Sequence, residues 1–258
     1  MSMRYKGAVL SATAPVTSSS SAIGIWTMRQ QLQAVGGTGW PAYVPPPTVI
    51  GQAYGGGYYA GQISTTANGV ATHYLIVAPK ASGQSTIDNI KWKNGGLTTT
   101  GANSVINGPS NTSIITALAA TDSNYQAAAF CLNVNNAGGI GGYTDWYIPA
   151  TYELEVLYYF LKPNTVANAT GTGANPYAVS PEPVNTNHTS GSPAQTSATG
   201  ANGFRTGEAN TFFENVYWTS TEISSSNVTN VNFYHGQIDQ TALKYSNGTV
   251  RLVRRVPV

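Results

Sequence analysis

The sequence predicts an α+β fold in which short antiparallel strands are combined with two helices and preceded by an extended N-terminal arm. Short β-branched and aromatic runs bounded by glycine and proline, which are typical of strands, recur from Thr48 to the C-terminus. Apolar residues at helical spacing occupy two segments near the middle of the chain. The chain before Thr48 contains Ser-, Thr- and Pro-rich stretches, a composition of extended chain.

Residues 1–47 are predicted to form the arm, and residues 48–258 the folded domain. The segment SATAPVTSSSSA indicates extended chain. In GIWTMRQQLQAVGG, apolar residues three and four apart predict a short helix that ends at Gly36-Gly37, and the prolines of WPAYVPPP favour polyproline II. We expect the arm to become ordered on partner chains, with a flexible leader as the alternative. The candidate assembly residues are Ile25, Trp26, Met28, Leu32 and Trp40.

Two predicted strands and a helix follow the arm. The strands are GGGYYAGQIS and ATHYLIVAPK, and the apolar run Tyr74–Val77 indicates a buried strand. The segment SNYQAAAFCLNV predicts a helix because apolar residues recur at i, i+3, i+4 and i+7, namely Ala127, Phe130, Cys131 and Val134. Cys131 then lies in the core, where a free cysteine behaves as a small apolar residue.

A second helix is predicted over residues 151–161. Thr151 is its candidate N-cap, and Glu153 lies in the first turn, where a carboxylate interacts favourably with the helix dipole. Lys162-Pro163 ends the helix. Its apolar stripe consists of Leu154, Leu157, Tyr158 and Leu161.

Residues 164–213 show almost no periodicity, and a segment of this length inside a domain is usually functional or disordered. Strands are predicted again in FFENVYWTSTEIS, NVTNVNFYHGQIDQ, ALKYS and TVRLVRRV. Asn247-Gly248 predicts a two-residue hairpin between the last two. The domain is therefore expected to end in an antiparallel meander that reaches the C-terminus.

Composition disfavours several function classes. Charged residues make up 9% of the chain and the net charge is +2, so the surface must consist mainly of neutral hydrogen-bonding side chains. Such a surface suits carbohydrate contact or close packing in an assembly, whereas nucleic-acid binding needs a stripe of Lys and Arg. Cys131 is the one cysteine, so neither an internal disulfide framework nor a cysteine-built zinc site is expected. We also expect synthesis in a cytoplasm without membrane insertion, because neither a signal peptide nor a membrane-length apolar run is visible.

An ordered set of motifs, from AAAFCLNVNN through GGYTDWYIPATYELEV and VYWTSTE to VRLVRRV, resembles the C-terminal domain family of collagen-like proteins. That family belongs to the wider C-type lectin-like fold, and the resemblance extends over about residues 120–256. The chain departs from the family pattern at Tyr147, where the family usually has Arg. An ion pair made by that arginine is therefore not expected from Tyr147. The matching residues are Asp145, Trp146, Pro149, Glu153, Leu154, Tyr217, Trp218, Ser220, Thr221, Glu222, Val250, Arg251, Val253 and Arg254.

The resemblance implies a fold in which two helices pack beside a twisted antiparallel core and the chain ends lie close together. The matching aromatic and charged residues would then be internal scaffold. Ligand contacts would come from the long segment 164–215 and from exposed faces of the final strands. The Glu-Pro-Asn, Gln-Pro-Asp and Trp-Asn-Asp motifs of calcium-dependent sugar binding do not occur in the sequence, so no calcium site, other metal or cofactor is expected.

Three stretches of the first half, RYKGAVLSATAP, GIWTMRQQLQA and GVATHYLIVAPKASG, resemble segments of tailed-bacteriophage virion proteins. This resemblance implies a protein of the virion tail or tail fibre that is made in a bacterial cytoplasm. Its arm would bind other virion proteins, and the chain would form a homo-oligomer such as a trimer. Phage receptor-binding proteins of the lectin-like fold include the major tropism determinants, whose C-terminal strands are diversified.

The C-terminal strands supply the candidate ligand-binding residues. Polar and apolar side chains alternate in NVTNVNFYHGQIDQ, so about half of the polar ones are expected to face solvent. The partner would be a host cell-surface glycan or protein, bound by neutral hydrogen bonds and aromatic stacking. The alternative is a purely structural virion component, such as a decoration, collar or baseplate protein, whose domain packs on neighbouring subunits. The candidates are Asn230, Asn232, Tyr234, His235, Gln237, Asp239 and Gln240.

The sequence does not favour an enzyme. Glu153 and Glu155 are two residues apart and point in different directions around a helix, so they cannot act as a glycosidase pair. His73, His188 and His235 lack the spacing of metal ligands. The formylglycine-generating enzymes share the lectin-like fold but depend on a pair of cysteines.

Overall fold

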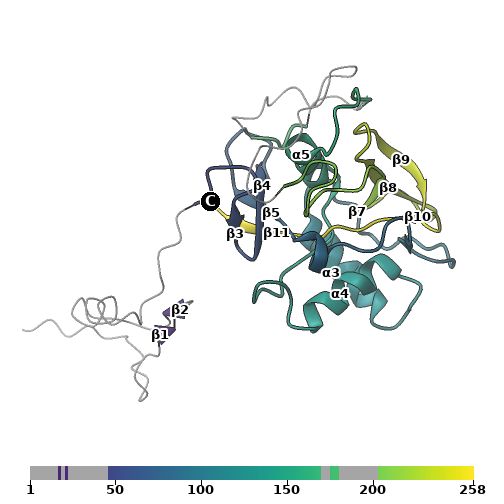
Figure 1. The fold of residues 1–258 in the computed structure, drawn as a ribbon. Helices are drawn as coiled ribbons and strands as arrows, with labels where there is room; N and C mark the ends of the chain where they lie inside the picture. The colour runs from purple at the N-terminus through teal and green to yellow at the C-terminus, as the bar shows by residue number, and fades with distance from the viewer. Residues whose placement is uncertain (1–16, 19–20, 23–45, 170–174, 180–202) are drawn as a thin grey trace, which may run out of the picture. The chain divides into compact units, whose positions relative to one another are not determined.

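The computed structural model describes residues 17–18, 21–22, 46–169, 175–179 and 203–258 (Figure 1). The chain divides into two compact units, residues 1–46 and 47–258. In the first unit, β1 (Thr17–Ser18) and β2 (Ser21–Ala22) pair antiparallel. The expected helix of the arm lies outside the described residues. The same holds for the candidate assembly residues Ile25, Trp26, Met28, Leu32 and Trp40.

The second unit combines helices with antiparallel sheets, so the predicted α+β class is confirmed. Its described helices are α2 (Lys80–Gly83), α3 (Gly108–Ala119), α4 (Gln126–Asn136) and α5 (Thr151–Leu161). Within the described part of the chain, none of the helices has the length and apolar content needed to cross a membrane.

Two larger sheets form the strand framework of this unit. One has four strands in the order β11-β5-β4-β3, the other has three in the order β7-β8-β9, and β10 pairs with β6 in a short ladder. The strands are β3 (Ala53–Tyr54), β4 (Gly57–Ile63), β5 (His73–Val77), β6 (Ile90–Lys91), β7 (Val216–Glu222), β8 (Asn227–Asn232), β9 (Ile238–Leu243), β10 (Asn247–Gly248) and β11 (Val253–Pro257).

The last strand does not continue the meander. β11 pairs antiparallel with β5 in the other sheet, so the prediction that the meander reaches the C-terminus is wrong. Asn247-Gly248, predicted to be a hairpin turn, forms β10 and pairs with β6. A Cβ at Gly248 would lie 2.7 Å from Nε1 of Trp218, whose indole N–H donates to Ile90 O at 2.8 Å. This glycine therefore permits a close approach rather than a tight turn.

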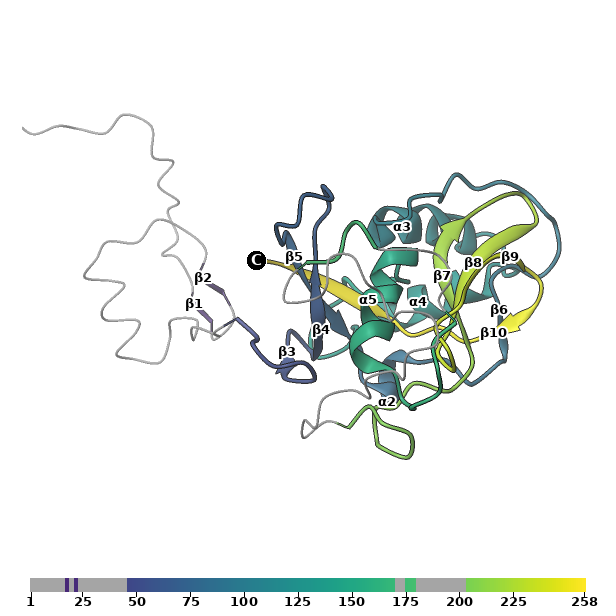
Figure 2. The same cartoon turned by 90° about the horizontal axis from the view of Figure 1, so that it is seen from above.

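Helix α5 packs against both larger sheets (Figure 2). Its Leu154, Leu157 and Leu161 are fully buried and belong to one core cluster with residues of β4, β5, β7 and β8. Burying a leucine side chain stabilises a fold by roughly 1.5–3 kcal/mol. Tyr158 of the same stripe meets Phe233 edge-on, with ring centroids 5.5 Å apart. Packing on two sides therefore fixes this helix.

The start of α5 differs from the prediction in one residue. Thr151, predicted as the N-cap, is the first helical residue, and Ala150 occupies the cap position. The N–H of Ala150 donates to Glu153 Oε2 at 2.7 Å, so the carboxylate three residues into the helix satisfies this donor. Thr151 instead donates its backbone N–H to Thr221 Oγ1 at 3.1 Å, which links α5 to β7.

A second core cluster contains Trp92, Trp146 and Trp218 together with residues of α3 and α4. Cys131 on α4 is fully buried in this cluster, which confirms its predicted core position. Its thiol donates to Trp146 O at 3.2 Å. Burial raises the pKa of the Cys131 thiol to about 12.

We predict that Cys131 does not react with a thiol reagent such as DTNB while the protein is folded, and reacts fully in guanidinium. The reactive species is the thiolate, which burial disfavours. The measurement is the absorbance of the released chromophore in native and denaturing buffer at one mildly alkaline pH. Rapid stoichiometric labelling of the native protein would contradict the buried position.

Candidate ligand-binding face

The sheet β7–β8–β9 has one buried face and one partly open face. Tyr217, Val231 and Ile238 are neighbours across its three strands. All three are buried in the cluster that contains the apolar stripe of α5. Because side chains alternate along a strand, the residues next to these three in each strand point away from α5.

The row that points away from α5 consists of Trp218, Asn230 and Asp239. In the next row Asn232 lies opposite Gln237, and its backbone N–H donates to Gln237 O at 2.9 Å. Polar side chains from β8 and β9 thus lie side by side on one surface. We call the accessible part of this surface the amide face and define it by Asn232, Gln237 and Asp239.

The turn between β8 and β9 presents Tyr234 at the tip of the hairpin. The N–H of Gly236 donates to Asn232 O at 2.6 Å, and the N–H of Tyr234 donates to Asn232 Oδ1 at 2.9 Å, so local bonds close the turn. Tyr234 is 43% exposed, and Gln237 is exposed as well. An accessible phenol ring and an accessible carboxamide on the same hairpin suit stacking on a sugar ring combined with hydrogen bonds to its hydroxyls.

The structure separates the seven predicted ligand-binding residues by exposure. The exposed ones are Tyr234, Gln237 and Gln240, and the half-buried ones are Asn232, His235 and Asp239. Asn230 is only 6% exposed, so a ligand on the surface would not reach its side chain, and its place among the contact residues is corrected. The reason is its position in the central strand, between Trp218 and Asp239.

The carboxylate of Asp239 accepts hydrogen bonds from its own strand. Its Oδ1 accepts the backbone N–H and the hydroxyl of Thr241, both at 2.7 Å. β9 is the edge strand of its sheet, and the carboxylate takes a backbone donor that an added strand would need. One carboxylate oxygen of Asp239 is therefore engaged within β9.

His235 joins the hairpin tip to the segment that follows α5. Its carbonyl oxygen accepts the N–H of Ala169 at 2.8 Å, and its Nδ1 accepts the N–H of Gln237 at 3.3 Å. Burial and the nearby charge of Lys162 lower the pKa of His235. The imidazole is therefore neutral at physiological pH and adds no charge to the face.

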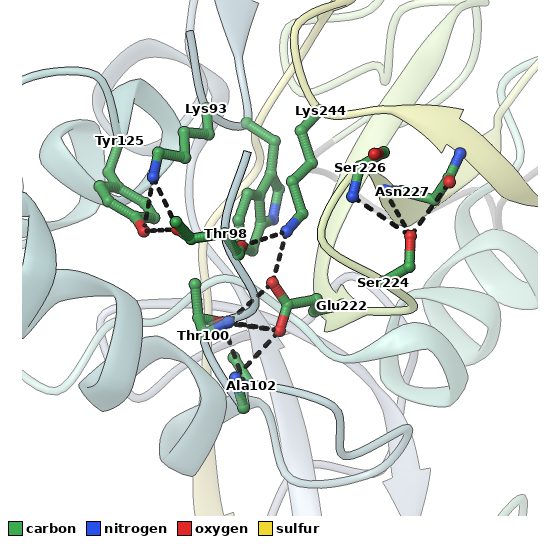
Figure 3. Close-up of polar contacts among 12 residues, drawn as sticks. Lys93, Thr98, Thr100, Ala102, Tyr125, Glu222, Ser224, Ser226, Asn227 and Lys244 are labelled. Atoms are coloured by element: carbon green, nitrogen blue, oxygen red, sulfur yellow. Dashed lines mark hydrogen bonds and ion pairs between the residues drawn. The ribbon is translucent and has the colours of Figure 1, made fainter. Parts of the chain in front are cut away.

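The other end of the sheet is held by a buried ion pair (Figure 3). Lys244 Nζ contacts Glu222 Oε1, and each side chain is at most 1% exposed. Glu222 also accepts the N–H groups of Thr100 and Gly101, with the shortest distances at 2.7 and 2.9 Å. Lys244 donates to Thr98 O at 3.1 Å. Because both charges are compensated, the pair ties β7 and the turn after β9 to the loop that holds these three residues.

Three exposed apolar side chains near this end were not predicted: Ile223, Leu243 and Tyr245, with exposures of 48%, 38% and 45%. Strict alternation from Ile238 would place Leu243 on the amide face. A register shift between β8 and β9 adds one residue to β9 and turns Leu243 to the other side. The sequence pattern gives no sign of this bulge.

The described parts of the long segment 164–215 serve mainly as scaffold. Asn168 is 3% exposed, and Phe204 and Phe212 are buried in the cluster around α5. Ala178 forms a β-bridge to Ile63 of β4. These residues therefore pack rather than present a surface to a ligand. Among the residues that the structure describes, no three His, Cys, Asp or Glu side chains come together as a metal site.

Both ends of the second unit lie at the four-stranded sheet. The chain enters at Pro47, shortly before β3, and the N–H of Val258 donates to Thr72 O at 3.2 Å, next to β5. In Figures 1 and 2, β8 and β9 lie on the opposite side of the unit from β3 and the C-terminus. The amide face is thus remote from the points where the chain enters and leaves.

Comparison with protein families gives a match of residues 86–254 to the Lcl C-terminal domain. Among solved structures, a fimbrial protein from Bacteroides ovatus ATCC 8483 aligns with 14% identity and a TM-score of 0.34, over 73% of this chain and 36% of that chain. The present chain thus spans about a third of that protein, and a likeness of this degree supports no argument about fold or function. No curated protein matches the chain.

We predict that Glu222→Gln lowers the free energy of unfolding by about 3–5 kcal/mol, because it leaves the buried Lys244 ammonium without its counter-charge. The control is Asp145→Asn, which removes the same charge from a pair with Arg254 in which the aspartate side chain is 55% exposed. That control should cost less than Glu222→Gln, because water reaches the Asp145 carboxylate and screens the pair. Urea unfolding measures both, and equal losses would contradict the assigned role of Glu222.

We predict that Gly236→Ala destabilises the domain more than Gly142→Ala. Both glycines have left-handed backbone, with φ of +83° and +81°, so each substitution carries a strain of about 1–2 kcal/mol. A Cβ at Gly236 would lie 2.2 Å from the ring of Tyr158, whereas one at Gly142 has nothing within 4 Å. Denaturant midpoints measure the difference, and equal midpoints would show that the tip does not rest on α5.

Proposed function

The chain belongs to the Lcl C-terminal domain family, and we propose from this premise that it is a bacteriophage virion protein of the tail or tail fibre that displays its C-terminal domain for host-surface recognition. Membership of the family indicates a phage-associated or cell-surface protein. The virion assignment is supported by the resemblance of the first half to segments of tailed-phage virion proteins. Other virion proteins would bind the arm, and the chain would act as a homo-oligomer.

We further propose that residues 47–258 adopt a C-type lectin-like fold. Helices beside antiparallel sheets, and first and last strands that belong to one sheet, support it. The positions of the motif residues also support this fold. Trp146 and Trp218 are buried in the core, Glu222 forms a buried ion pair, and Arg254 binds Asp145 through two hydrogen bonds of 2.8 and 2.9 Å.

The observation that carries the ligand proposal is the neutral polar character of the amide face and the hairpin tip. The carboxamide of Gln237 offers donors and an acceptor that match sugar hydroxyls, Asn232 adds the donors of its Nδ2, and Tyr234 offers an aromatic ring. In residues 216–250 the one lysine or arginine, Lys244, is fully buried. The ligand class is therefore a neutral carbohydrate, and its binding should depend little on salt.

Binding rather than catalysis is the proposed role of this face. Cleavage of a glycosidic bond needs two carboxyl groups that flank the bond. On the amide face Asp239 is the one acidic residue, and its Oδ1 is engaged by Thr241. The site therefore holds a ligand without an acid–base pair to act on it.

A purely structural role, in a decoration, collar or baseplate component, is the second candidate. The exposed apolar side chains Ile223, Leu243 and Tyr245 favour it, because such residues suit packing on a neighbouring subunit. The two roles differ in what the free protein does. A receptor-binding protein adheres to bacterial surface material, whereas a packing component does not.

We predict that the purified full chain binds members of an array of bacterial surface polysaccharides, and that Tyr234→Ala or Gln237→Ala weakens this binding about tenfold, or about 1.4 kcal/mol. The matched control is Tyr245→Ala, a tyrosine of similar exposure at the opposite end of β9, which should bind like the unaltered protein. Circular dichroism checks the fold of each variant. Binding that survives both tip substitutions, or no binding to any polysaccharide, would favour the structural role.

A further inference from the structure

A lysine and an asparagine meet in a buried position just beyond α5. Lys162 is 0% exposed and Asn168 is 3% exposed. Lys162 Nζ donates to Asn168 Oδ1 at 2.8 Å and also to Val166 O. Two side chains six residues apart are thus held with an amine against an amide, away from bulk water.

The amine lacks the partner that a buried ammonium normally has. Among the described residues, no carboxylate lies within salt-bridge distance of Lys162. Burial lowers the pKa of Lys162 to about 8, and Glu214 opposes this shift. At neutral pH a minor fraction of the Lys162 amine is therefore neutral, and the neutral form is the nucleophile.

The side-chain amide of Asn168 is held in a way that favours nucleophilic attack on its Cγ. Asn168 Oδ1 also accepts a hydrogen bond from the Tyr158 hydroxyl at 2.6 Å, and this donor, which is not the nucleophile, withdraws electron density from Cγ. Asn168 Nδ2 is buried and has no hydrogen-bond partner among the residues that the structure describes. The oxygen on which charge would develop is held by a donor, whereas the leaving nitrogen is not.

We propose that Lys162 and Asn168 react to form an intramolecular isopeptide bond. Nζ attacks Cγ, and the Tyr158 hydroxyl stabilises the oxyanion that forms on Oδ1. The bond between Cγ and Nδ2 then breaks, one Nζ proton passes to the leaving nitrogen, and ammonia departs. The reaction joins an amine and a primary amide into a secondary amide plus ammonia, so it needs no oxidant or other co-reactant. Fixed proximity supplies the effective concentration that a free amine and amide lack.

The bond would fix the segment that supports the hairpin tip. Ala169 follows Asn168 directly, and its N–H binds the carbonyl of His235. With one cysteine in the sequence, the chain has no internal disulfide to do this. This inference does not depend on the proposed function, because it concerns covalent structure and not ligand binding.

The chain contains its own comparison pair. Lys91 Nζ donates to Asn94 Oδ1 at 2.9 Å, a similar distance, but this pair is exposed. Among the described residues, no tyrosine hydroxyl donates to that amide. If proximity alone were enough, both pairs would react; if burial and the tyrosine donor matter, Lys162 and Asn168 alone react.

The test is the intact mass of the purified full chain in denaturing solvent, after incubation of the folded protein. We expect a mass lower than that of the sequence by one molecule of ammonia. In the peptide that begins at Val156, after cleavage at Glu155, Lys162 should resist amine acetylation under denaturing conditions while Lys91 is acetylated. Lys162→Arg should show the full mass, and Tyr158→Phe should show the full mass or a slower loss.

The full mass in the unaltered protein, with Lys162 open to acetylation, would overturn the proposal whatever the variants do. A loss of ammonia that persists in Lys162→Arg would also overturn it, because it would arise from succinimide formation at an asparagine. Mild alkali separates these products, since it hydrolyses a succinimide and leaves an isopeptide bond intact.

Discussion

The buried carboxylate of Glu153 is the constraint on which the arrangement of the second unit depends. Its Oε2 accepts the N–H groups of Ala150 at 2.7 Å and Gly108 at 3.1 Å, and its Oε1 accepts from the Tyr147 hydroxyl at 2.5 Å and from Arg255 Nε at 2.6 Å. One side chain thus joins the start of α5, the start of α3 and the C-terminal strand. A charge buried to this extent is tolerated only when it is fully paired, so these segments must meet in this way.

The candidate ligand-binding face follows from the position that this carboxylate gives to α5. On one side of the helix, Phe160 packs against Gly61 of β4, where the backbone has φ of +117° and a Cβ would lie 2.6 Å from the ring. On the other side, Tyr158 packs against Phe233 and under Gly236 at the hairpin tip. The tip that presents Tyr234 therefore rests on a helix that is itself held from both sides. Binding surfaces built on rigid elements need little reordering when a ligand arrives.

The elements that the sequence could predict are those set by local patterns. The strands around Tyr74–Val77 and the helix 151–161 are confirmed because period-2 and period-3.6 patterns belong to single segments. Pairing between distant segments has no such local pattern. Gly248 could be recognised as a special position, but that it makes room for Trp218 depends on a residue thirty positions away.

In the candidate site, too, local patterns predicted some features, and contacts between strands determined the others. Alternation in the C-terminal strands predicted which stretch carries polar side chains at the surface, and Tyr234 and Gln237 lie exposed there. It could not predict that Asn230 is buried, because this depends on neighbours from two other strands. The family that the sequence resembles usually has an arginine at position 147, and in this chain another residue supplies that positive charge. Tyr147 donates a neutral hydrogen bond to Glu153, and Arg255 of β11 brings the positive charge.

Hydrogen–deuterium exchange of the full chain tests whether the β8–β9 side of the domain meets the host surface. Exchange would be compared with and without a bacterial surface polysaccharide that the protein retains on the array. We expect slower exchange in the backbone of residues 232–241, at the hairpin tip and edge strand, with the four-stranded sheet unchanged. Protection confined to the four-stranded sheet, where the chain enters and leaves, would contradict it.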